Sequence, residues 1–140
     1  MEIKKRFFKT LPKEAITIRE KVFVQEQGFT NEFDETDKNS IHIVLFSDNS
    51  AIATGRLVKD QDENTYIIGR VAVLEAYRKL HLGNLILTSL EEKAKELGAT
   101  KICVSAQCRV QTFYEKHDYN AVGDVYYDEY CKHIKMVKTL

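Results

Sequence analysis

Two stretches of this sequence combine residue types that can do chemistry. The first, "EAYRKLHLGNLIL" (75–87), carries the basic pair Arg78 and Lys79 and then Gly83, where a helical pattern begins. The unpaired N–H groups and the positive dipole end of a helix N-terminus attract anions, and glycine permits close approach to the backbone. The stretch therefore predicts a cradle for a phosphate or pyrophosphate group. The alternative is an ordinary solvated turn between a strand and a helix.

The second stretch, "AQCRVQTFYEKHDY" (106–119), places Tyr114 seven residues after Gln107. It follows an apolar run directly and has the pattern of a short helix. A tyrosine at this point can present its hydroxyl to a cleft at the end of the preceding strand. The alternative is an aromatic side chain packed on the sheet, which is the usual position for a residue such as Phe113, and both interpretations of Tyr114 stay open.

These two stretches lie at the ends of two apolar runs. The runs "YIIGRVAVL" (66–74) and "KICVSAQ" (101–107) predict strands, and the pattern between them predicts a helix over 83–97. A crossover through a helix allows the two strands to lie parallel. The N-terminus of that helix then lies at the carboxyl end of the first strand, so the cradle and Tyr114 are expected at the same edge of a sheet.

The rest of the chain predicts the elements that complete this sheet. We expect a helix over 13–27, a strand pair over 41–59, a short helix over 110–117 and two late strands over 119–127 and 133–138. The expected order is strand, helix, three strands, helix, strand, helix and two strands. Meandering strands with one crossover unit predict an α+β fold, in which helices cover a mixed sheet.

The composition limits the class of protein. With 140 residues, 44% of them hydrophobic, the chain is expected to form a single domain over 1–140 with a sizeable core. Equal numbers of basic and acidic residues, 21 each, argue against a nucleic-acid or membrane-surface binder, and no apolar run reaches membrane-spanning length. The three cysteines, Cys103, Cys108 and Cys131, lack metal-ligand spacing, so we expect reduced thiols, no metal site and a cytoplasmic location.

The two stretches together resemble the GNAT superfamily of acetyl-CoA-dependent acyltransferases. The signature of that family is Arg or Gln, two residues, Gly, one residue, then Gly or Ala; Arg78 and Gly83 match its ends, and His81 stands in place of the first glycine. Gln107 and Tyr114 match a family pattern of an amide residue seven positions before a helix tyrosine. The segments "REKVFVQEQGF", "DETD", "IIGRVAV" and "EYCKHIKM" are similar to the ElaA-like (YjcF-like) group, although the last lacks that group's proline and glycine.

This resemblance implies a GNAT-type twisted sheet, mostly antiparallel with a central parallel strand pair, and acetyl-CoA as co-substrate. The pantetheine arm is expected between the two parallel strands and the pyrophosphate on the backbone N–H groups of 79–84. The resemblance implies these cofactor-binding residues: Val71, Ala72, Val73, Arg78, Lys79, Leu80, His81, Leu82, Gly83, Asn84, Gln107 and Tyr114.

The implied reaction is direct transfer of an acetyl group to an amine in a ternary complex. A strand N–H such as that of Val71 is expected to bind the oxyanion, and Tyr114 is expected to act as general acid toward the departing thiolate. For the general base the sequence offers Glu26, His42 and Asp34. Glu26 is alternatively a solvated helix end, and His42 is alternatively a satisfied histidine of the sheet.

Arg70 is unusual because it stands inside an apolar strand. A buried arginine needs a carboxylate partner, and the acidic segment "EFDETD" (32–37) is the expected source, with Arg19 pairing there too. That pairing would order the acidic loop over the acceptor site. The carboxylates suggest a cationic small-molecule or peptide amine as acceptor, such as a polyamine, an aminosugar or a lysine side chain, unless the loop is simply solvated.

Two other functions remain open at this point. The pattern "REKVFVQEQ" with a downstream acidic run is also similar to acyl-homoserine-lactone synthases, which use an acyl donor and S-adenosylmethionine, but those chains are longer. A non-catalytic acyl-CoA-binding or regulatory module is the other alternative, because His81 departs from the family signature. The sequence fits a monomer or a homodimer.

Overall fold

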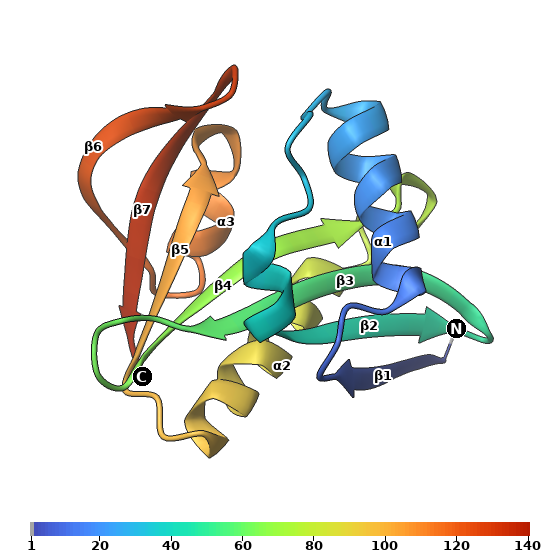
Figure 1. Cartoon of the computed structure of the whole chain (residues 1–140), viewed down its shortest axis with the longest axis horizontal. Coiled ribbons are helices and arrows are strands. Elements are labelled where there is room, and N and C mark those ends of the chain that lie inside the picture. The colour runs from blue at the N-terminus through green and yellow to red at the C-terminus, as the bar shows by residue number, and fades with distance from the viewer. Residues whose placement is uncertain (1) are drawn as a thin grey trace.

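The computed structural model describes residues 2–140 and shows one seven-stranded mixed sheet flanked by helices (Figure 1). The strand order is β1-β2-β3-β4-β5-β7-β6. The elements are β1 (Ile3–Phe8), α1 (Lys13–Arg19), β2 (Ile41–Ser47), β3 (Ser50–Lys59), β4 (Thr65–Val73), α2 (Leu82–Glu96), β5 (Lys101–Gln107), α3 (Gln111–Glu115), β6 (Asn120–Asp128) and β7 (Cys131–Thr139). The expected α+β class and the order of elements are confirmed.

The parallel pair at the centre of the sheet is short. Strands β4 and β5 pair from Thr65–Lys101 to Ile68–Val104, and every other neighbouring pair in the sheet is antiparallel. Beyond Ile68 the two strands diverge, and Figure 1 shows β5, β7 and β6 turning away from β1–β4. The divergence leaves the second half of β4, from Gly69 to Val73, without a partner on its β5 side.

A β-bulge in β4 lies at the start of this divergence. Between the pairs Arg56–Gly69 and Thr54–Ala72, β4 contains one residue more than β3. Arg70 lies in the bulge with φ +54°, a left-handed conformation that is uncommon for a residue other than glycine. Bulges bend a strand and redirect side chains, so this one directs β4 away from β5.

Helices cover both faces of the sheet because strand residues alternate between them. Ile43 and Leu45 of β2 face the core cluster that contains Ile86 and Leu90 of α2, whereas Val44 faces the cluster of α1. Gly55 of β3 lies under α2, where an added Cβ would lie 2.8 Å from Ile86 Cγ2, so the helix approaches the sheet closely there.

The first helical region differs from the uniform helix expected over 13–27. The α-helix ends at Arg19 and continues as a π-helical segment, Glu20–Glu26. The wider turn changes which side chains face the sheet, and it brings the end of this segment to the diverging part of β4, with which it makes contact. No helix over 2–140 is long and apolar enough to span a membrane.

Candidate active site

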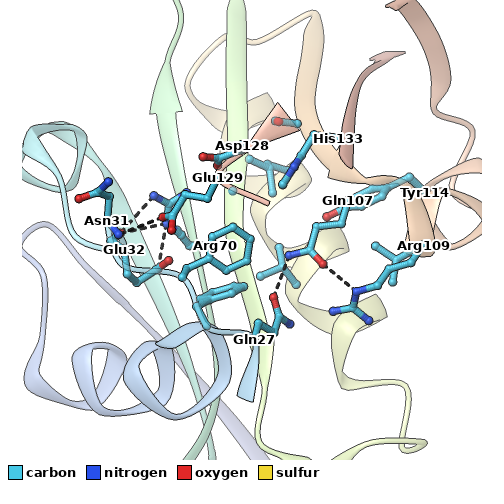
Figure 2. A pocket seen from close by; sticks show the side chains of 17 residues that line it. Gln27, Asn31, Glu32, Arg70, Gln107, Arg109, Tyr114, Asp128, Glu129 and His133 are labelled. Carbon is cyan, nitrogen blue, oxygen red and sulfur yellow. Dashed lines mark hydrogen bonds and ion pairs between the residues drawn. The ribbon is translucent and has the colours of Figure 1, made fainter. Parts of the chain in front are cut away.

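Two cavities meet where β4 and β5 diverge. The larger, of about 650 Å³, extends from β4 to the first turn of α2 and is here called the splay cleft. The smaller, of about 170 Å³, lies between the diverging strands and the β6–β7 turn and is called the inner cavity; Figure 2 shows it. The residues that line both are Gln27, Val71, Arg109, Val110 and Tyr114.

The turn before α2 has the geometry of an anion cradle. Lys79 has φ +70° and His81 has φ +59°, and no side chain caps the start of the helix within the described residues. The first-turn N–H groups of an α-helix have no partner within the helix, and here they border the splay cleft together with Lys79 and Gly83. These residues fit a bound pyrophosphate. His81 adopts the left-handed conformation that the family's glycine favours, so its side chain does not prevent this turn.

Arg78 is held by contacts on both sides of the splay cleft. Its Nη1 and Nη2 atoms donate to the two carboxylate oxygens of Glu26 at 2.9 and 2.8 Å, and its Nε donates to the carbonyl oxygen of Val73 at 3.0 Å. The pair is bidentate, which fixes its geometry. Glu26, expected as a candidate base, therefore lies in the splay cleft with both carboxylate oxygens bonded to a cation.

Tyr114 lies at the junction of the two cavities. Its side chain is 9% exposed and packs edge-to-face on the rings of Phe113 and Tyr119. Burial raises the pKa of Tyr114 to about 12, because a phenolate would be poorly solvated there. The hydroxyl therefore stays protonated at neutral pH and can donate a hydrogen bond or a proton to a group at the junction.

Most of the residues expected to bind the cofactor line the splay cleft, with two exceptions. Gln107 lines the inner cavity instead, where its Nε2 donates to Gln27 Oε1 and its Oε1 accepts from Arg109 Nε, both at 2.9 Å. Leu80 is 46% exposed and lines neither cavity. The remaining residues line the splay cleft: Val71, Ala72, Val73, Arg78, Lys79, His81, Leu82, Gly83, Asn84 and Tyr114.

His42, expected as a second candidate base, lies away from both cavities. Its side chain is 1% exposed and its Nε2 is 3.0 Å from the carbonyl oxygen of Asp37. Burial lowers the pKa of His42, because the imidazolium form would be poorly solvated. In this position it has the role of the satisfied sheet histidine that the sequence left open.

The expected pairing of Arg70 and Arg19 with the acidic segment is confirmed. Arg70 Nε lies 2.9 Å from Glu32 Oε2, and Arg19 contacts Glu32 and Asp37 at 2.9 and 2.8 Å. Arg56, which the sequence did not single out, also joins this arginine–carboxylate network. Its members are Arg19, Arg56, Arg70, Glu32, Asp34 and Asp37.

The network determines the charge state of its carboxylates. Burial disfavours ionisation of Asp37, but hydrogen bonds from Arg19 and Arg56 outweigh it and hold the pKa of Asp37 far below its usual range. Burial dominates at Glu32 and raises its pKa despite Arg70 and Arg19. The network orders the acidic loop as one wall of the inner cavity, to which Glu32 and Arg70 both belong.

The β6–β7 turn also lines the inner cavity, next to the acidic loop, and sequence reasoning did not place it at the site. The Glu129 carboxylate accepts bonds from the N–H groups of Thr30 and Asn31 and from the Thr30 hydroxyl, at 2.9–3.1 Å. Tyr130 donates its hydroxyl to the carbonyl oxygen of Gln27. These contacts join the turn to the loop after the π-helical segment. The segment "EYCKHIKM", already noted for its resemblance, was the only available signal.

Comparison with known proteins agrees with this geometry. The acetyltransferase (GNAT) domain family matches residues 8–140. The uncharacterised N-acetyltransferase YjcF of Bacillus subtilis is 32% identical over 130 residues, which cover 90% of this chain and 91% of YjcF. The crystal structure of Escherichia coli ElaA superimposes with a TM-score of 0.87 at 25% identity, covering 98% of this chain and 99% of ElaA.

A more distant structure shares the fold with a ligand present. An acetyltransferase of Bacillus subtilis, solved in complex with CoA, has a TM-score of 0.77 at 15% identity over 99% of both chains. The sheet, the splayed parallel pair and the cradle define a GNAT-type acyltransferase fold. The chain belongs to the acetyltransferase (GNAT) family, in the ElaA/YjcF-like group, and is a GNAT-type N-acetyltransferase.

Proposed function

We propose that the protein transfers an acetyl group from acetyl-CoA to a primary amine, within one domain over residues 1–140. The observation that carries this proposal is the position of Tyr114, whose side chain lines both the splay cleft and the inner cavity. A donor in the cleft and an acceptor in the inner cavity would meet at this side chain. The amine can then attack the thioester without a covalent enzyme intermediate.

The splay cleft supplies the groups that acetyl-CoA needs. The first turn of α2, Lys79 and Arg78 would hold the pyrophosphate, while the unpaired part of β4 from Val71 to Val73 would hydrogen-bond the pantetheine amides. The guanidinium of Arg78 already donates a hydrogen bond to the carbonyl oxygen of Val73. This bond would have to break if a pantetheine amide donates to the same oxygen.

The reaction makes three demands on the protein. The acceptor nitrogen must be neutral to attack, the oxyanion needs a donor, and the departing thiolate needs a proton. The backbone N–H of Val71, next to the bulge, is the proposed oxyanion donor, and the Tyr114 hydroxyl is the proposed proton donor. No cysteine lines either cavity among the residues that the structure describes, which supports direct transfer.

The inner cavity favours a cationic acceptor of small cross-section. Its volume is about 170 Å³, and Asp128 and Glu129 lie across it from Arg109 and Tyr114 (Figure 2). The cations of the arginine–carboxylate network neutralise Glu32, whereas no arginine or lysine pairs with Asp128 or Glu129 among the described residues. A small primary amine, or the amine end of a peptide, would find its counter-charges at the β6–β7 turn.

The proposal is tested first by ligand binding. A ligand that binds the folded state stabilises it by about 2.7 kcal/mol at a hundredfold excess over its dissociation constant. We expect acetyl-CoA and CoA to raise the melting temperature and S-adenosylmethionine to leave it unchanged. A shift with S-adenosylmethionine would favour the acyl-homoserine-lactone synthase alternative, and no shift with CoA would refute the cradle.

Turnover is tested next with an amine panel. Release of CoA thiol is followed with putrescine, lysine, a lysine peptide and glucosamine as acceptors. We expect Tyr114→Phe to reduce kcat on the best acceptor by about 10²–10⁴-fold and to keep the CoA-induced thermal shift. CoA binding without thiol release from any acceptor would instead indicate a non-catalytic acyl-CoA-binding module.

A further inference from the structure

His133 is a buried histidine that the proposed chemistry has not yet used. It lies on β7, paired with Gln107 of β5 on one side and Tyr126 of β6 on the other. Its side chain is 6% exposed and lines the inner cavity, and Figure 2 shows the ring directed from β7 toward the cavity. A titratable side chain therefore borders the space proposed for the acceptor.

The contacts of the ring determine which nitrogen carries the proton. Nδ1 lies 3.0 Å from the carbonyl oxygen of Cys131, and a carbonyl can only accept a hydrogen bond. Nδ1 must therefore be the protonated nitrogen of the neutral ring, which leaves a lone pair on Nε2. Nε2 has no hydrogen-bond partner among the residues that the structure describes, so the lone pair is available to a ligand in the cavity.

The ring is also held against rotation. Tyr126 stacks on it with ring centroids 6.0 Å apart and an interplanar angle of 25°, and Phe29 packs edge-on with centroids 6.4 Å apart. The Tyr126 hydroxyl is in turn hydrogen-bonded to Ser105. A ring fixed on two sides and bonded through Nδ1 presents Nε2 in one direction, which is the arrangement that a general base requires.

We propose that His133 is the general base of the acetyl transfer, an inference that rests on the proposed function. The acceptor enters as an ammonium ion, and Nε2 of His133 removes one proton from it. The neutral amine attacks the thioester carbonyl, so that the C–N bond forms and the C–S bond breaks. As the C–S bond breaks, the thiolate takes the proton of the Tyr114 hydroxyl, and the second proton of the nitrogen passes to the Tyr114 oxygen and restores the hydroxyl. The imidazolium returns its proton to water.

The other candidates are less suited to this role. Glu26 is bonded to Arg78 through both of its oxygens, and His42 lies outside both cavities. Hydrogen bonds from Asn31 and Thr30 lower the pKa of Glu129, which makes that carboxylate a weaker base. An imidazole is the side chain whose proton affinity matches neutral pH, where proton removal from an ammonium ion must be repeated in each cycle.

Charged side chains of both signs surround His133 in the inner cavity. Among the described residues, the ionisable groups that share the cavity with His133 are Glu32, Arg70, Arg109, Tyr114, Asp128 and Glu129. Because a general base must be unprotonated to act, the expected signature is an acid limb in the pH profile that disappears when the imidazole is removed.

The test compares wild type with His133→Asn on two acceptors. Asparagine can still donate to the Cys131 carbonyl but has no basic nitrogen. The best alkylamine of the panel must lose a proton before attack, whereas methoxyamine is already neutral at pH 7. We expect the variant to lose about 10²–10⁴-fold in kcat/KM with the alkylamine and less than tenfold with methoxyamine, and to keep its CoA-induced thermal shift.

Each outcome decides the matter. Equal activity of variant and wild type on both acceptors would overturn the base role and leave the acetyl transfer intact. An equal loss on both acceptors, or a lost thermal shift, would show that His133 is only structural. No thiol release by wild type with any amine would refute the acetyl transfer itself, and the base role with it. Independently of turnover, an NMR spectrum showing the Nε2–H tautomer would contradict the proposal.

Discussion

Replacing Arg19 with methionine should show how much the arginine–carboxylate network stabilises the fold. Arg19 is 1% exposed and makes four hydrogen bonds, to Glu32 Oε2, the Glu32 carbonyl oxygen and both carboxylate oxygens of Asp37. Methionine fills a similar volume without charge, so the packing loss is small. The main effect is that two nearly buried carboxylates each lose a cation.

The expected loss of stability depends on the ion pairs that Glu32 and Asp37 keep in the variant. Removing one partner of a buried ion pair costs about 3–5 kcal/mol. Glu32 keeps Arg70 at 2.9 Å and Asp37 keeps Arg56 at 2.9 Å, so we expect the lower end, about 3 kcal/mol. With a slope of about 2 kcal/mol per molar urea, the unfolding midpoint should fall by about 1.5 M. The control is Arg6→Met, an exposed arginine over the Phe8 ring, for which we expect less than about 1 kcal/mol.

Lowering the pH should reduce the difference in the free energy of unfolding between wild type and Arg19→Met. The folded-state pKa of Asp37 lies below its unfolded value, so its contribution to stability is present above about pH 4 and is lost as the pH falls further. In the variant, each carboxylate loses one of its cationic partners and is protonated more easily, so less stability remains to be lost. A loss below about 1 kcal/mol at pH 7, or a gap that stays constant from pH 7 to pH 3, would refute this account.

Three further predictions concern the site. His81→Gly should raise the free energy of unfolding by up to about 1 kcal/mol, because glycine tolerates φ +59°, and should keep the CoA-induced thermal shift. The β-branched variant His81→Val should lower the free energy of unfolding and reduce the CoA-induced thermal shift. Glu26→Gln should leave kcat within a few-fold of wild type, and calorimetry should show equal or tighter CoA binding because Arg78 is released; a 10²-fold loss of kcat would instead restore Glu26 as the base. Glu129→Gln should raise KM for the amine several-fold without changing the CoA-induced shift, because the turn is held to Thr30 less firmly; an unchanged KM would show that the turn does not shape the acceptor site.

The parallel pair and its crossover helix could be predicted from the sequence because each depends on a local pattern. The apolar runs that became β4 and β5 are separated by one clear helical period, and such a connection permits few arrangements. The pairing of Arg70 was also predictable, since a cation in an apolar strand has to find a carboxylate. In both cases a rule of local chemistry restricts the answer to very few possibilities.

The remaining parts of the site depend on contacts between distant segments. The Glu26 carboxylate appeared free in the sequence because its partner Arg78 is 52 residues away. His42 and His133 both stand in strands, and only the path of the sheet places His42 outside the cavities and His133 beside one. The bulge at Arg70 likewise follows from how β3 and β4 pair, which no local pattern fixes.

The hydrogen bonds between Thr30 and Glu129 have a consequence for the order in which the site forms during synthesis. The two residues are 99 positions apart, and the wall that they hold together includes the turn between β6 and β7. A chain emerging from the ribosome presents its N-terminal part first. The residues of the proposed donor cradle are therefore synthesised before the last residues of the proposed acceptor pocket, and the pocket forms only once the β6–β7 turn has folded back onto the loop at Thr30.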